Sequence, residues 1–180
     1  MYKLAISTSG EYVSAAIFED KLLASFVSKT NRGSTGILLN QINELFDKTK
    51  ANRKDLSALY LDVGPGYYTG LRIGLSVSQG LGAVLGIPII PVNGLDALAF
   101  AAHTSHRKIC SLIDIKRSEF AYCEYMPVPG GVTRESDPQV ISVESLEIKL
   151  SDDADKKLLV GNWDLIKLSL IHISEPTRRY

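Results

Sequence analysis

Cysteine is scarce in this chain of 180 residues, which contains only Cys110 and Cys123. Small secreted domains that depend on disulfides carry more, so the count argues against a disulfide framework. Both residues fall within strands that the apolar pattern predicts, and cysteine is one of the most frequently buried residue types. We therefore expect two free, buried thiols in a reducing cytoplasm.

An excess of charge of either sign is also missing, because 20 Lys and Arg residues balance 20 Asp and Glu residues. The basic residues stand in scattered pairs, so no nucleic-acid surface is indicated and any contact with RNA should be indirect. The first ten residues, MYKLAISTSG, are neither a signal peptide nor a membrane span. We expect a cytoplasmic protein that does not contact membranes.

The apolar residues predict an ordered series of strands and helices. Three short runs within residues 2–29 predict a meander of strands. Residues 34–50 place apolar side chains three or four positions apart, as an amphipathic helix does. The run at 87–92 predicts another strand. Its prolines indicate that it lies at a sheet edge or that they stand at the ends of the strand. Further strands are expected at 56–63, 108–115 and 119–126, and helices at 71–86 and 94–103.

This order of elements indicates a mixed-sheet α/β fold with crossover helices. It is also the order of the ribonuclease-H-like half-domain of the actin-like ATPase superfamily. Past residue 126 we expect a loop at 127–138 and then one more strand and helix at 139–150.

The chain is accordingly divided into an N-terminal lobe at 1–107, an incomplete second lobe at 108–167 and a tail at 168–180. The tail, LSLIHISEPTRRY, resembles vector or adapter read-through, and the fold is argued without it.

The stretch DVGPGYYTGLRIG, residues 62–74, contains four glycines, which let a backbone approach another group closely. Its spacing matches neither a Walker A loop nor a dinucleotide-binding fingerprint. The loop STSG that begins at Ser7 has hydroxyl groups but no carboxylate to hold Mg²⁺ beside phosphates. ATP chemistry, any catalytic residue and any bound cofactor or metal are therefore not expected in this chain.

The end of this stretch predicts a helix start. Thr69 is expected to cap the helix through its hydroxyl group, so that the helix begins at about Gly70. Arg72 in the first turn opposes the helix dipole at a cost of about 0.3–1 kcal/mol, so it should have an anionic partner. Asp62 is the nearest candidate.

A stripe of small residues then recurs every four positions along the helix. Glycine within a helix costs about 1 kcal/mol relative to alanine, so a close contact must compensate. The contact can come from a neighbouring helix or sheet of the same chain, or from the helix of a partner protein. The stripe consists of Gly70, Gly74, Ser78, Gly82 and Gly86.

DVGPGYYTGLRIGLSVSQGLG resembles the signature of the TsaB family, also called YeaZ, which has a GPGSFTGLRIG-like sequence after the fourth strand. Three other stretches, LAISTS, GIPIIPVNGLDALA and LIDIKRSEFAYCEY, are also similar to that family. The resemblance extends from residue 1 to about residue 125, and Ser7 departs from the usual Asp of the family. The matching motif residues are Gly64, Pro65, Gly66, Thr69, Gly70 and Arg72.

The resemblance implies a non-catalytic subunit of the machinery that makes threonylcarbamoyladenosine beside the tRNA anticodon. Its paralogue TsaD, which holds the metal, would be bound and activated in a heterodimer, and the small ATPase TsaE would join the pair. Contact with tRNA would be indirect. Whether the chain forms a homodimer in the absence of the partner stays an open question. The implied pairing surface consists of Gly70, Gly74, Ser78, Gly82, Leu38 and Ile42.

Two other classes stay open as alternatives, a stand-alone ATP-dependent kinase and a metalloprotease of the same superfamily. The metal site of the paralogue needs paired histidines on the first helix, where this chain has none. The close pair His103 and His106 lacks an acidic neighbour, and closed metal sites need three or four protein ligands. We expect these histidines to lie at an ordinary helix C-terminus.

Overall fold

The computed structural model describes residues 1–29, 34–151 and 156–162. The chain divides into two compact units, Met1–Ala97 and Leu98–Tyr180. The boundary between them falls within helix α3 (Gly94–Ala101), whereas the sequence predicts it at residue 107. The tail expected at 168–180 lies outside the described residues.

The first unit contains a five-stranded sheet in the order β3-β2-β1-β4-β5. The predicted meander is confirmed, because β1 (Tyr2–Ser7), β2 (Tyr12–Phe18) and β3 (Leu22–Lys29) pair antiparallel. Strands β4 (Leu56–Asp62) and β5 (Ile89–Val92) then join parallel to β1. The position of β5 at the edge confirms what its prolines predicted.

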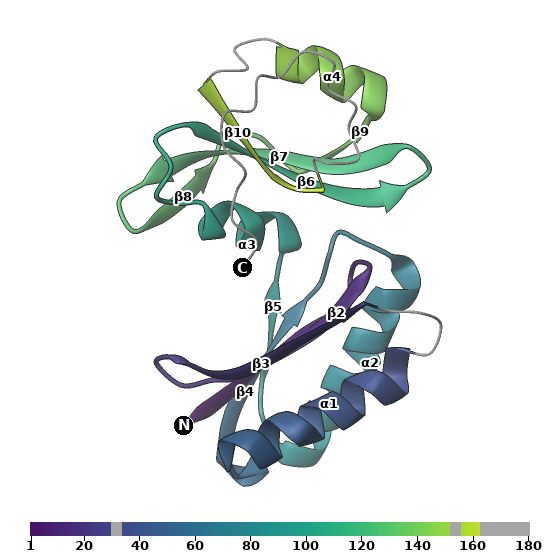
Figure 1. Cartoon of the computed structure of the whole chain (residues 1–180), viewed down its shortest axis with the longest axis vertical. Helices are drawn as coiled ribbons and strands as arrows, with labels where there is room; N and C mark the ends of the chain where they lie inside the picture. Colours follow the sequence, from purple (N-terminus) through teal and green to yellow (C-terminus); the bar gives the residue numbers. More distant parts are fainter. Residues whose placement is uncertain (30–33, 152–155, 163–180) are drawn as a thin grey trace. The chain divides into compact units, whose positions relative to one another are not determined.

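Two helices cover the same face of this sheet (Figure 1). Helix α1 (Ser34–Thr49) packs on β2 and β3, helix α2 (Tyr68–Leu85) packs on β4 and β1, and the helices touch each other. Helix α2 ends where Gly86 takes a left-handed conformation, φ 67°, that favours glycine. The predicted apolar face of α1 is confirmed as core, and its buried members are Leu38, Ile42, Leu45 and Phe46.

The second unit has its own five-stranded sheet. Strands β6 (Lys108–Lys116) and β7 (Glu119–Val128) form the predicted hairpin, and α4 (Val143–Ser151) follows β9 (Gln139–Ser142) as expected. Cys110 and Cys123 are free and buried on the hairpin, as predicted, and burial raises the pKa of the Cys110 thiol.

Two strands of this sheet differ from the sequence prediction. The expected loop at 127–138 contains β8 (Gly131–Arg134), which pairs with β7 across a tight turn where Gly130 has φ 81°. Strand β10 (Lys157–Gly161) pairs parallel to β6 and was not predicted. The prolines and glycines around β8 mark the turn, so they obscured the short strand that follows it.

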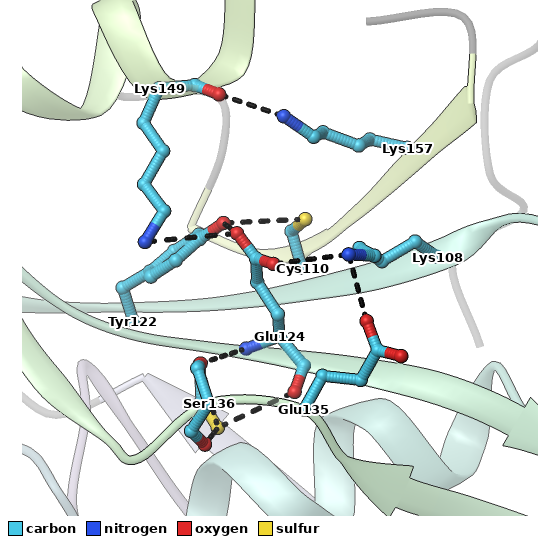
Figure 2. A network of polar contacts seen from close by, with 9 residues as sticks. Lys108, Cys110, Tyr122, Glu124, Glu135, Ser136, Lys149 and Lys157 are labelled. Atoms are coloured by element: carbon cyan, nitrogen blue, oxygen red, sulfur yellow. Dashed lines mark hydrogen bonds and ion pairs between the residues drawn. The ribbon is translucent and has the colours of Figure 1, made fainter. Parts of the chain in front are cut away.

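A polar network centred on Glu124 links β6, β7 and α4 (Figure 2). The Tyr122 hydroxyl donates to Glu124 and lies 3.6 Å from the Cys110 sulfur. The ammonium groups of Lys108 and Lys149 lie 3.4 and 3.7 Å from the Glu124 carboxylate, and Lys149 also lies over the Tyr122 ring. Burial alone would raise the pKa of Glu124, but the tyrosine and the two lysines outweigh it and lower that pKa.

We predict that Glu124→Gln lowers the free energy of unfolding by about 1.5–3 kcal/mol, as expected for lost hydrogen bonds to a charged group. Because folding lowers the pKa of Glu124, its contribution is present above the unfolded pKa and disappears as pH falls through the folded pKa. The difference in melting temperature between wild type and variant should therefore shrink on acidification. Thermal unfolding followed by circular dichroism at several pH values measures it.

The control for this prediction is Glu119→Gln, because Glu119 lies on the same strand but is exposed. This variant should unfold like the wild type at each pH. Equal melting temperatures for Glu124→Gln and the control would contradict the stabilising role of the network.

Candidate functional site

The glycine-rich stretch lies at the carboxyl ends of β1 and β4, next to the STSG loop. The Asp62 carboxylate at the end of β4 accepts hydrogen bonds from the hydroxyls of Ser7, at 2.7 Å, and Ser9. Its other oxygen accepts from the amide of Gly64 at 2.8 Å. Sequence reasoning placed no carboxylate beside the STSG loop, because Asp62 reaches it only through the parallel pairing of β1 and β4. Asp62 thus holds the two loops together.

The glycines of the motif make room for the chain's own STSG loop. A Cβ atom on Gly66 would lie 2.2 Å from the Ser9 carbonyl oxygen, and one on Gly70 would lie 1.9 Å from that of Thr8. The amide of Tyr67 also donates to the Ser9 carbonyl at 2.6 Å. The close approach that the glycines indicated is therefore within one chain.

The stripe of small residues packs against the same sheet. A Cβ atom on Gly74 would lie 2.4 Å from the Thr8 hydroxyl oxygen, and one on Gly82 would lie 3.2 Å from Ile89. Ser78 is fully buried. The contact that compensates for these glycines is thus made within the chain, by its own sheet and the loop after β1. The prediction that the glycines make room for a partner's helix is therefore wrong. Leu38 and Ile42 are likewise buried in the core rather than displayed.

The start of α2 also differs from the sequence prediction. The helix begins at Tyr68, its N-cap is Tyr67 without a side-chain hydrogen bond, and Thr69 is inside the first turn rather than at the cap. Arg72 does not pair with Asp62, whose carboxylate is taken by Ser7, Ser9 and Gly64. Instead, the Arg72 guanidinium lies over the Tyr68 ring, 5.5 Å from its centroid.

Apart from Arg72, the solvent side of α2 carries residues that the sequence analysis did not select. They recur every three or four positions, and all are exposed. Arg72 is the one charged residue among the 18 residues of this helix. We call this surface the α2 outer face, and it consists of Tyr68, Arg72, Leu75, Ser76, Gln79 and Ala83.

The described residues contain neither a cluster of metal ligands nor a helix fit to cross a membrane. Within 1–29, 34–151 and 156–162, no three side chains of His, Cys, Asp or Glu come together as metal ligands would. His103 follows the end of α3, where its ring stacks on Phe100 and its Nδ1 lies 2.8 Å from the Phe100 carbonyl. None of the described helices combines the length and apolar character that crossing a bilayer requires.

The two mixed sheets and their crossover helices define a ribonuclease-H-like protein of the actin type. Two crystal structures from Pseudomonas aeruginosa share the fold, one described as YeaZ and one as an uncharacterized protein with similarity to peptidase YEAZ. They superpose with TM-scores of 0.71 and 0.73 at 26% and 27% identity, over 79% of this chain and 68% and 67% of theirs.

Sequence comparison identifies the family within this class. The TsaB protein of Buchnera aphidicola from Schizaphis graminum is 30% identical over 168 residues, which are 91% of this chain and 80% of that protein. The TsaB protein of Escherichia coli K12 is 26% identical over 140 residues, 77% of this chain and 61% of that protein. Residues 24–162 match the family described as TsaD, tRNA N6-adenosine threonylcarbamoyltransferase. The chain belongs to the TsaB family.

The lengths of these relatives differ from the length of this chain. The chain spans four-fifths of the Buchnera protein but only 51–61% of the relatives from E. coli, Haemophilus influenzae and Bacillus subtilis.

We predict opposite effects for alanine at two glycines of α2. Gly70→Ala should destabilise the fold, because its Cβ atom would meet the Thr8 carbonyl oxygen and overpacking costs about 1–3 kcal/mol. Gly80→Ala should stabilise the fold by up to about 1 kcal/mol, because no atom lies within 4 Å of its Cβ and alanine favours the helix. Chemical denaturation measures both. A stable Gly70→Ala variant would show that the two loops are not in close contact.

Proposed function

We propose that this chain is a non-catalytic subunit of the system that adds the threonylcarbamoyl group to adenosine in tRNA. In this role it binds and activates a TsaD-family protein. The names of the relatives support a role in this process, because both are described as the tRNA threonylcarbamoyladenosine biosynthesis protein TsaB. A kinase or a metalloprotease of the same superfamily is the alternative.

The observation that carries the binding role is the composition of the α2 outer face. An exposed helix face is normally rich in charged residues, and the C-terminal half of α1 follows that rule with Glu44, Asp47 and Lys48. The α2 outer face has one charge, together with small side chains and the exposed Tyr68. Loss of charge with retention of Tyr and Arg is typical of the core of a protein interface.

Apolar side chains extend this surface. Leu75 and Val84 on α2 and Ile37 and Leu39 on α1 are all exposed. Because the two helices lie together on one face of the sheet, a partner could cover both. The partner surface that we propose is therefore the exposed side of α2 together with the start of α1 at Ile37 and Leu39.

A non-catalytic role is favoured by the state of the STSG loop. In actin-like ATPases the corresponding loop binds phosphate and carries an Asp. Here Ser7 replaces it, and the backbone carbonyls of the loop face glycines of the motif at close range. The carboxylate that does lie beside the loop, Asp62, accepts hydrogen bonds from Ser7, Ser9 and the Gly64 amide, so it is engaged within the chain. The role of TsaE as a third member, indirect contact with tRNA and location in the cytoplasm are proposed with this function.

We predict that Leu75→Glu weakens binding to the cognate TsaD-family protein at least tenfold, because it buries a charge in an apolar contact. Calorimetric titration of the full chain measures the affinity. Leu23→Glu is the matched control, since Leu23 on β3 is 46% exposed and Leu75 is 44% exposed. Both variants should keep the melting temperature of the wild type.

Three results would contradict the proposed function. Wild-type chain that does not bind the TsaD-family protein would refute the heterodimer. Equal affinities for Leu75→Glu and Leu23→Glu would refute the assigned surface. Micromolar binding of ATP by the chain alone would favour the kinase alternative.

A further inference from the structure

Arg72 lies on the α2 outer face and has no carboxylate partner among the described residues. None of the ion pairs among the described residues includes its guanidinium, and Asp62, the partner expected from the sequence, bonds to the two serines and Gly64 instead. Arg72 is the fifth residue of α2, beyond the first turn, and the other 17 residues of this helix carry no charge that could pair with it.

The Tyr68 ring, four residues earlier on the same helix, lies next to this guanidinium. The ring is 73% exposed and lies 5.5 Å from the Arg72 Cζ atom. A cation–π contact of this kind uses none of the five N–H donors of the guanidinium in a hydrogen bond. Those donors are therefore available to a planar acceptor such as a carboxylate, which arginine binds with two parallel hydrogen bonds.

We propose that Arg72 binds a carboxylate of the partner protein and that this ion pair anchors the α2 outer face. The inference rests on the proposed function and adds to it the chemistry of the partner surface, which is an acidic side chain surrounded by apolar groups. A protein carboxylate fits better than an RNA phosphate, because nucleic-acid sites use several cations and this face has only one.

The test is the affinity of the full chain for the cognate TsaD-family protein at 50 mM and 500 mM NaCl, for wild type and three variants. Arg72→Gln should weaken binding at least tenfold at low salt, and the salt dependence should largely disappear with the charge. Arg72→Lys should fall between, because an ammonium group keeps the charge but not the paired donors. The matched control is Arg53→Gln, because Arg53 lies over the Phe46 ring at 4.8 Å, at the C-terminal half of α1 and outside the proposed surface.

The outcomes separate this inference from the proposed function. If wild type and Leu75→Glu behave as predicted but Arg72→Gln binds like Arg53→Gln, only the ion pair is refuted. Equal loss at both salt concentrations would also refute it, because packing rather than charge would then be responsible. If the wild type does not bind, the proposed function and this inference both fail.

Sedimentation of the isolated chain tests a second copy as the source of the carboxylate. The ion pair with the partner predicts the same oligomeric state for wild type and Arg72→Gln. A wild-type dimer that dissociates in Arg72→Gln, with unchanged affinity for the TsaD-family protein, would overturn the proposal.

Discussion

The first unit depends on the close contact between the start of α2 and the loop after β1. Carbonyl oxygens of Thr8 and Ser9 occupy the space that side chains at Gly70 and Gly66 would need. The Thr8 hydroxyl donates to the Gly70 carbonyl at 2.7 Å, so the contact is hydrogen-bonded as well as packed. Because α2 connects β4 to β5, this contact also positions the parallel half of the sheet. It leaves the opposite side of α2 exposed, and the proposed partner surface follows from that.

The second unit is stabilised in a different way, through a partly buried charge with several partners. Glu124 is 14% exposed and interacts with one hydroxyl and two ammonium groups from β6, β7 and α4. Lys108 also pairs with Glu135 at 2.7 Å, and that hydrogen bond is the main reason that its pKa is raised. A buried carboxylate without these partners would be strongly destabilising, so the network must form as a whole.

Much of the fold follows from the sequence, because apolar spacing reports which face of an element is buried. The alternation in β2 and the three-to-four spacing in α1 both predicted the observed core. Strand β10 was not predicted, because its parallel pairing with β6 joins segments about 50 residues apart and no local sequence pattern indicates such a pairing. The small-residue stripe indicated a close contact correctly, but spacing alone does not say which surface makes it. The sequence analysis missed the exposed, nearly uncharged side of α2. A count of charged residues along that helix could have identified it as a candidate partner surface.

The central claim is that a partner covers the exposed side of α2 and the start of α1. Hydrogen–deuterium exchange of the chain, alone and with the TsaD-family protein, tests it most directly. The account predicts slower exchange in peptides from α1 and α2 on complex formation, and unchanged exchange in the exposed edge strand β3. Protection confined to β3 or to the second unit, with none in α1 and α2, would contradict it.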